Sequence, residues 1–93
     1  RETKIRPGVV IASHSYLSEH PDVLIGILTT RPPRPFTMSD YTLQDWHLAG
    51  LRSESYFRCY VPTVHRSEFT LIGHLTERDW TSVRQRVNTA FSR

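Results

Sequence analysis

Two apolar runs near the start of the chain have the composition of buried β-strands. Residues 5–12 and residues 23–29 are both dense in valine and isoleucine, which favour extended backbone. A polar segment, residues 13–22, separates them and contains the turn-forming sequence His20-Pro21-Asp22. The pattern predicts two strands joined by a loop, in a sheet that is buried on both faces or curled on itself.

A proline-rich segment follows the second run. Residues 30–40 contain Pro32, Pro33 and Pro35, which exclude a helix or a central strand and predict a long loop. The spacing of Pro32 and Pro35 also matches a PxxP ligand of SH3 or WW domains. Because the segment connects two elements of a small fold, the sequence favours a connecting loop.

Weaker patterns fill the middle of the chain. Residues 41–48 are spaced for either a short strand or a helical turn, and Gly50 ends that pattern. Residues 55–64 predict a strand in which Tyr56 and Tyr60 alternate with Phe57, and Pro62 restricts it to a sheet edge or a bulge. Residues 69–72 predict a further short strand.

The last element is an amphipathic helix over residues 77–91. Its predicted apolar face contains Trp80, Val83, Val87, Ala90 and Phe91. Thr76, with Asp79 three residues later, resembles a capping box at its start. Several short strands followed by one helix describe a mainly β fold: a small SH3-like barrel with a C-terminal helix packed on it, in one domain spanning residues 1–93.

Composition sets limits on the partner and the compartment. Twelve Lys and Arg residues against nine Asp and Glu give a net charge of +3, and eleven of the twelve are arginine. Arginine suits phosphates and base edges, so the bias favours an anionic partner, although high genomic GC content gives the same bias. A single cysteine, Cys59, excludes an internal disulfide and fits a reducing cytoplasm. No run of apolar residues is long enough for a membrane span, and no signal peptide is visible.

Common catalytic motifs and metal sites are not indicated. The five histidines and Cys59 show no HxxxH or CxxC spacing, so we expect neither a metal nor a cofactor. The sequence contains no P-loop, no GxSxG and no Rossmann fingerprint.

An ordered set of short segments carries a family resemblance. Arg6-Pro7 enters the first strand, the second strand ends in Thr29-Thr30-Arg31, and Ala49-Gly50-Leu51, Phe57-Arg58-Cys59 and Leu71-Ile72-Gly73 follow before the helix. From residue 6 to residue 91 this order resembles the PemK/MazF family of toxin ribonucleases. The resemblance implies an SH3-like barrel of the PemK/MazF/CcdB type. It also implies a strand before the Arg-Pro step that this sequence appears not to contain, which would leave an open sheet edge.

The resemblance also implies roles for individual residues. Arg6 and Thr29 match the catalytic positions, and the RNA-binding positions fall on Thr30, Arg31, Arg58 and Tyr60. Tyr60 stands where the PemK-like subgroup has an aspartate that serves as the general base. The resemblance therefore does not identify the general base in this sequence, and Glu2 is the nearest alternative. Taken without the family, Arg6 reads as a solvated residue at a strand start, and Thr29 as an ordinary strand residue.

The implied function is a sequence-specific endoribonuclease toxin. It would cleave single-stranded RNA by attack of the ribose 2'-OH without metal, act as a cytoplasmic homodimer, and be neutralised by a cognate antitoxin. Two other functions remain open from the residues. One is a non-enzymatic toxin of the same fold that poisons DNA gyrase through its C-terminal helix, and the other is an inactive SH3-like interaction domain.

Overall fold

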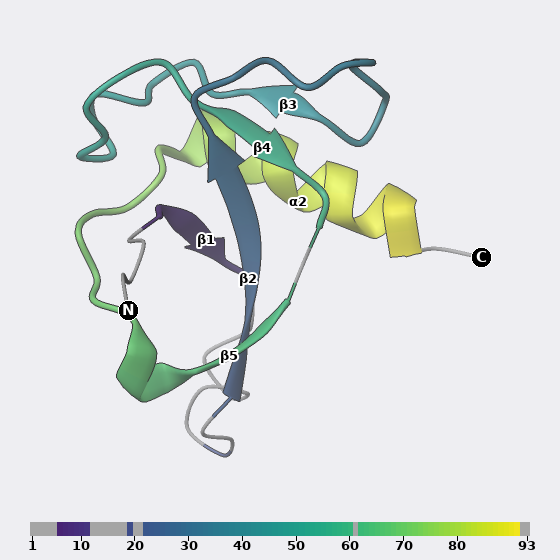
Figure 1. Ribbon diagram of the computed structural model, residues 1–93. Coiled ribbons are helices and arrows are strands. Elements are labelled where there is room, and N and C mark those ends of the chain that lie inside the picture. Colours follow the sequence, from purple (N-terminus) through teal and green to yellow (C-terminus); the bar gives the residue numbers. More distant parts are fainter. Residues whose placement is uncertain (1–5, 12–18, 20–21, 61, 92–93) are drawn as a thin grey trace.

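The computed structural model describes residues 6–11, 19, 22–60 and 62–91 (Figure 1). The predictions for Glu2 and for residues 13–18, 20 and 21 of the first loop lie outside this range. The elements are β1 (Gly8–Val10), β2 (Asp22–Thr29), β3 (Tyr41–Thr42), β4 (Tyr56–Arg58), β5 (Thr63–His65), the 3-10 helix η1 (Arg66–Glu68) and α2 (Glu77–Phe91).

The strands form one antiparallel sheet around β2. The order is β1-β2-β4-β3, and β5 pairs with the first half of β2 while β4 pairs with its second half. Within the described residues the sheet does not close, with β1 at one edge and β3 at the other. The predicted mainly β fold with a C-terminal helix is therefore confirmed, and the barrel is only approximate.

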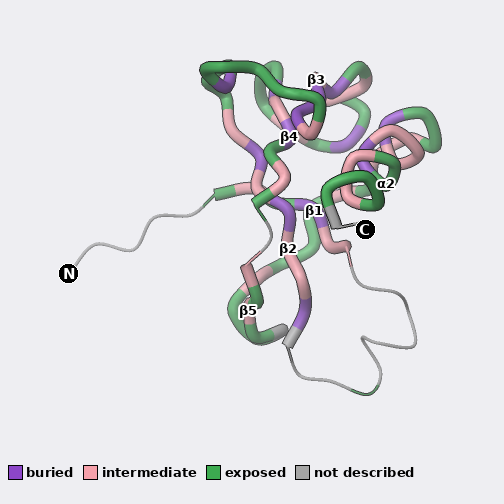
Figure 2. The backbone as a smooth tube through the Cα atoms, turned by 90° about the vertical axis from the view of Figure 1, so that its right-hand side faces the viewer, coloured by how far each residue is buried: buried purple, intermediate pink, exposed green. Residues whose placement is uncertain are grey.

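The core lies between one face of the sheet and α2. Leu28 of β2, Phe57 of β4 and Val83 of α2 are buried together, and Val9 and Tyr41 join them. Figure 2 colours the backbone by the burial of each residue. Gly26 makes room for this core, because a Cβ at this position would collide with the ring of Phe57. We call the sheet face that α2 covers the inner face, and the opposite one the outer face.

The helix begins and ends where the sequence predicts. Val83 is fully buried, and Trp80 and Val87 pack partly buried against the core, as the apolar spacing requires. Ala90 is exposed, so the predicted apolar face is too long at its C-terminal end; the side chain of Phe91 lies outside the description. No helix within the described ranges is both long enough and apolar enough to cross a membrane.

Three strand predictions are wrong in extent or type. The described part of the first strand is three residues, Gly8–Val10, and residues 55–64 divide into β4 and β5. Residues 69–72 form no strand, and Leu71 and Ile72 are each 65% exposed. Their apolar composition predicted a strand, but a strand requires a hydrogen-bonding partner, and none of the described strands pairs with this segment.

The N-terminus of α2 is fixed through a buried carboxylate. Asp79 is fully buried and accepts hydrogen bonds from the Tyr41 hydroxyl at 2.6 Å, from the Gln44 backbone N–H at 2.9 Å and from the Asp45 backbone N–H at 2.8 Å. Half of the predicted capping box is present, since Thr76 Oγ1 accepts from the Asp79 N–H at 3.4 Å. The other half is replaced, because the Asp79 carboxylate connects the helix to the turn after β3.

A surface ion pair joins the same two segments. Asp45 accepts from the Thr76 hydroxyl at 2.6 Å and from Arg78 Nη2 at 2.6 Å. The hydrogen bonds from Arg78, and then the one from Thr76, lower the pKa of Asp45 below its ordinary value of 3.8.

We expect this pair to make stability depend on pH on the acid side. Because the folded state lowers the Asp45 pKa, the stabilisation is complete above the ordinary carboxyl pKa and is lost as the pH falls through the lowered value. Urea unfolding between about pH 6 and about pH 3 measures this loss. Asp45→Asn is the control, and it should reduce the slope in that range; an identical slope in both proteins would contradict the assignment.

Candidate nucleic-acid interface

Polar side chains meet on the outer face of the sheet. Ile27 and Thr29 of β2 alternate with the buried Leu28, so they point to the face opposite α2. Arg58 pairs with Ile27 across the β2–β4 ladder and is exposed on the same side. Thr29 and Arg58 are therefore diagonal neighbours on the outer face. In ordinary sheet geometry the Cα atoms of such a pair lie about 7–8 Å apart.

Arg6 reaches the same place from β1. Gly8 pairs with Ile27, and the Leu28 N–H donates to the Pro7 carbonyl at 3.3 Å, so the antiparallel register continues past the end of β1. One further step places Arg6 opposite Thr29. The Cβ atoms of two residues that lie directly opposite each other on neighbouring strands are about 4.5–5.5 Å apart. Arg6 is exposed, and none of the described carboxylates forms an ion pair with it.

A backbone hydrogen bond at the end of β2 orients the Thr29 hydroxyl. Thr29 Oγ1 accepts a hydrogen bond from the Arg31 backbone N–H at 3.2 Å, which leaves its own proton free to donate. Thr30 and Arg31 are both exposed at the start of the long loop. The sequence-predicted residues Arg6, Thr29, Thr30 and Arg31 are thus neighbours in space.

A bulge between β4 and β5 turns Tyr60 outward. Ile27 of β2 pairs with Arg58 of β4, and Leu24 of β2 pairs with Thr63 of β5. Between these two pairs the segment from β4 to β5 contains two residues more than β2 does, which makes it a bulge. The chain folds tightly at this point, where the Tyr60 N–H donates to the Arg58 carbonyl at 2.7 Å. Tyr60 is left 69% exposed, as expected for a residue that stacks on bases. Of the two placements that Pro62 allowed, a sheet edge or a bulge, the structure has a bulge next to it.

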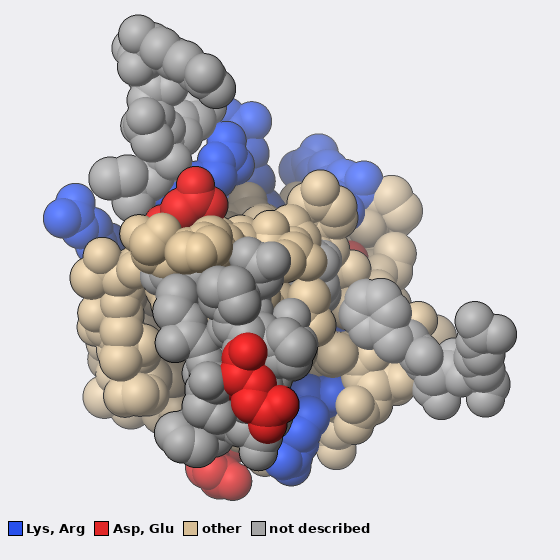
Figure 3. Space-filling model, turned by 90° about the horizontal axis from the view of Figure 1, so that it is seen from below, with Lys and Arg blue, Asp and Glu red and all other residues tan. Residues whose placement is uncertain are grey.

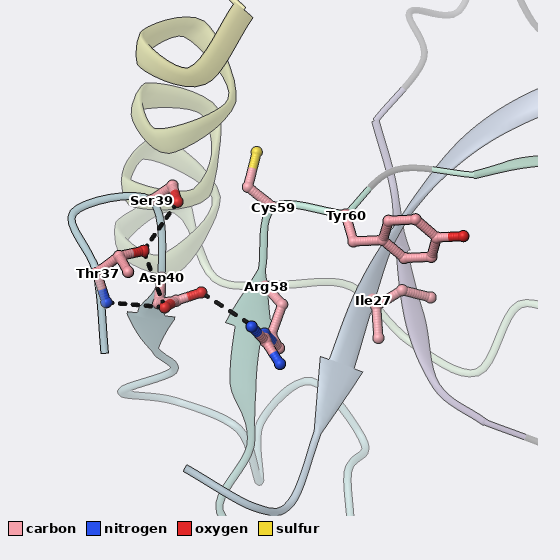
Figure 4. Close-up of a pocket in the computed structure, with 7 residues that line it drawn as sticks. All are labelled: Ile27, Thr37, Ser39, Asp40, Arg58, Cys59 and Tyr60. Carbon is pink, nitrogen blue, oxygen red and sulfur yellow. Dashed lines mark hydrogen bonds and ion pairs between the residues drawn. The ribbon is translucent and has the colours of Figure 1, made fainter. Parts of the chain in front are cut away.

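A pocket opens between this bulge and the proline-rich loop. Its cavity volume is about 410 Å³, and it is lined by Ile27, Arg58, Cys59 and Tyr60 on one side and by Thr37, Ser39 and Asp40 on the other (Figure 4). Figure 4 shows the Asp40 carboxylate directed at the Arg58 guanidinium, with Tyr60 and Ile27 on the far side of the arginine. Arg58 Nε lies 3.9 Å from Asp40 Oδ1.

Asp40 is the member of this site that the sequence did not single out. Its side chain is 4% exposed, and its Oδ2 accepts from the Thr37 N–H at 2.9 Å and from the Thr37 hydroxyl at 3.0 Å. The spacing of Thr37 and Asp40 is that of a hydrogen-bonded turn, which was the available signal. Only the fold shows that this turn places a carboxylate beside Arg58.

Cys59 and the residue types that bind metals are the remaining candidates for reactive chemistry. Burial, and then the charge of Asp40, raise the pKa of the Cys59 thiol, which disfavours the nucleophilic thiolate and agrees with a structural role. Within the described ranges, no group of three or more His, Cys, Asp or Glu residues is placed to hold a metal ion.

Comparison with known proteins identifies the fold. No protein-family model matches the chain, and no curated protein matches its sequence. The Mycobacterium tuberculosis toxin MazF-mt6 superposes with a TM-score of 0.77 at 17% identity, over 92% of this chain and 85% of the toxin. A second solved structure, of an Mtb toxin, gives a TM-score of 0.77 at 18% identity, over 92% of each chain. The chain has the fold of MazF toxins.

The MazF fold confirms the architecture that the ordered segments predicted. At 17% identity it places no functional residue, so the site on the outer face depends on the chain's own geometry. Tyr60 lines the pocket and is exposed, and Glu2 lies outside the described residues.

The face seen from below carries charges of both signs (Figure 3). Figure 3 shows the molecule from below, where Lys and Arg side chains lie in separate groups with Asp and Glu among them. In that view the described residues form no continuous basic patch. The grouping of Arg6, Arg31 and Arg58 around Thr29 is therefore a better indication of an anion site than the net charge of +3.

Proposed function

We propose that this chain is an endoribonuclease toxin of the MazF type, which cleaves single-stranded RNA at a short sequence. The proposal rests mainly on one observation: the β1–β2 register brings Arg6 opposite Thr29 on an open sheet face of a MazF fold. An exposed guanidinium beside a hydroxyl with a free proton suits a phosphodiester group.

The reaction proposed is an internal transfer within the RNA. The ribose 2'-oxygen attacks the neighbouring phosphorus, the new P–O bond forms, and the bond to the 5'-oxygen breaks. A proton leaves the 2'-hydroxyl, and a proton is taken up by the 5'-oxygen. Arg6 stabilises the negative charge that grows on the phosphate oxygens, and the Thr29 hydroxyl donates a hydrogen bond to one of them.

The surrounding residues hold the RNA strand. Arg31 and Arg58 are exposed on either side of Thr29 and pair with phosphates or base edges. Thr30 contacts the same strand at the loop, and the exposed ring of Tyr60 stacks on a base. This assignment accounts for all six residues that the sequence selected.

Protein partners belong to the same proposal. We place the chain in the cytoplasm as one domain of a homodimer, inhibited by a cognate antitoxin, since MazF-mt6 is itself described as a toxin. Exposed apolar side chains are available for such contacts: Met38 is 85% exposed, and Leu48, Leu71 and Ile72 are each about two-thirds exposed.

The test is cleavage of single-stranded RNA by the purified protein with and without EDTA. We expect full activity in EDTA, with products that carry a 2',3'-cyclic phosphate and a 5'-hydroxyl, because the nucleophile comes from the substrate. An oligonucleotide with 2'-deoxyribose at the cut site should bind, since phosphate contacts dominate affinity, and should resist cleavage. Loss of activity in EDTA, or cleavage of the deoxy substrate, would overturn the mechanism.

A further inference from the structure

We propose that the pocket between the bulge and the proline-rich loop is a base-recognition site that selects cytosine next to the scissile phosphate. The inference rests on the proposed function for its place in the reaction. The recognition itself follows from the hydrogen-bonding groups that Asp40 and Arg58 present in the pocket.

Asp40 offers the pocket one free acceptor. Its Oδ2 already accepts two hydrogen bonds from Thr37, which fix the carboxylate in place. Its Oδ1 accepts no hydrogen bond from the described residues, because Arg58 Nε at 3.9 Å is an ion-pair contact beyond hydrogen-bond length. A ligand donor that reaches Oδ1 gains a charge-assisted hydrogen bond in a largely buried place.

Arg58 offers several donors beside that acceptor. Its side chain is 52% exposed, and its two terminal amino groups make no hydrogen bond within the described part of the chain. The nearby carboxylate holds the guanidinium at the wall of the pocket. A base that enters the pocket therefore meets one hydrogen-bond acceptor, from Asp40, next to the planar group of donors of Arg58.

Cytosine matches this pattern with all three groups of its pairing edge. Its N4 amino group donates to Asp40 Oδ1, and its N3 and O2 atoms accept from the Arg58 fork. Uracil has a carbonyl in place of the amino group, which would meet the carboxylate oxygen and repel it. Guanine presents two donors and one acceptor on its pairing edge, so one donor finds no free carboxylate oxygen. Adenine has only one acceptor beside its amino group.

The pocket also supplies a stacking surface and the right location. The Tyr60 ring and the Ile27 side chain lie on the far side of Arg58 from Asp40, and both can cover the face of a base (Figure 4). Ile27 is two residues from Thr29 on the same face of β2. A base in the pocket therefore belongs to a nucleotide adjoining the phosphate held by Arg6 and Thr29.

The first experiment measures binding without cleavage. Cytidine 3'-monophosphate and uridine 3'-monophosphate differ only at the discriminating edge, and each is titrated into the ¹⁵N-labelled protein while backbone amide shifts are followed by NMR. We expect cytidine monophosphate to bind at least about tenfold more tightly, the discrimination typical of one good bidentate base contact, and to shift the amides of Thr37, Asp40 and Tyr60. Equal affinities, or no shift at these amides, would overturn the inference whether or not the protein cleaves RNA.

The second experiment changes the acceptor alone. In Asp40→Asn the amide oxygen keeps the bonds from Thr37, and the amide NH₂ replaces the free carboxylate oxygen. The cytidine-to-uridine affinity ratio should therefore fall at least about tenfold. Glu68→Gln is the control, since it makes the same chemical change on the exposed helix η1 and should leave the ratio unaltered. Thermal unfolding of each variant verifies the fold, and an unchanged ratio in a folded Asp40→Asn protein would reject the site.

Mapping the cut sites in a randomised RNA pool separates the two proposals. We expect cytosine to be enriched at one position beside the cut, and the enrichment to disappear in Asp40→Asn. Cleavage with no such enrichment rejects the pocket and keeps the ribonuclease. Selective binding of cytidine monophosphate by a protein that cuts no RNA keeps the pocket and rejects the ribonuclease.

Discussion

Replacing Arg6 with alanine is expected to lower the rate of RNA cleavage at least about 100-fold while leaving the fold intact. A preorganised donor aimed at charge that develops in the transition state typically contributes this much. Arg6 is exposed just before β1 and takes no part in the core, so stability should change little. Thr29→Val should cost a similar factor, because valine keeps the branched shape and removes the hydroxyl.

Matched variants separate catalysis from general charge and strand effects. Arg84→Ala removes the same charge from an exposed position on α2, on the other side of the sheet, and Thr63→Val removes a threonine hydroxyl from β5. Both should cleave at close to the original rate. Single-turnover cleavage of one defined oligonucleotide measures all four proteins, and the site assignment is wrong if Arg6→Ala and Thr29→Val cleave as fast as their controls.

Replacing Asp79 with alanine is expected to lower the free energy of unfolding by about 3–5 kcal/mol. Three donors lose their common acceptor, and each unsatisfied buried polar group costs roughly 1–3 kcal/mol, less where water reaches it. Such a loss is a large share of the stability of a typical domain, about 5–15 kcal/mol.

Two milder substitutions should lower the free energy of unfolding by less than Asp79→Ala does. Tyr41→Phe removes one of the three donors and should cost about 1.5–3 kcal/mol, the usual value for a hydrogen bond to a charged group. Asp79→Asn keeps one acceptor oxygen and should fall between Tyr41→Phe and Asp79→Ala. Urea unfolding followed by circular dichroism measures all three. A loss below about 1 kcal/mol in Asp79→Ala would show that the helix is not held in this way.

Elements with a strong local signal were predictable from the sequence. The strand β2 has a continuous apolar run, and α2 has both a period and an N-cap residue, so the prediction places both within about a residue. Residues 69–72 have the same kind of apolar run but pair with none of the described strands, and pairing is a long-range property that composition does not encode.

The candidate site was predictable only in part for the same reason. Arg6 and Thr29 both fall within strands that the sequence predicts, residues 5–12 and 23–29, so their proximity needed only an antiparallel register. Asp40 and Asp79 act through partners far away in sequence: Arg58 lies 18 residues from the first, and Tyr41 lies 38 residues from the second. Their spacing to nearby residues indicated only a turn and a helix cap.

A small shift of the short strand β1 would separate Arg6 from Thr29. Side chains alternate along a strand, so a slip of β1 by a single residue would turn Arg6 toward the helix side and away from Thr29. The strand β1 has three residues and lies at a sheet edge, and one backbone hydrogen bond on each side, at Pro7 and at Ile11, extends its pairing with β2. Edge segments open locally at a lower free energy than the whole molecule. If the proposed site is correct, catalytic competence depends on the local stability of this one edge strand, which hydrogen exchange measures, and activity can be lost while the core stays folded.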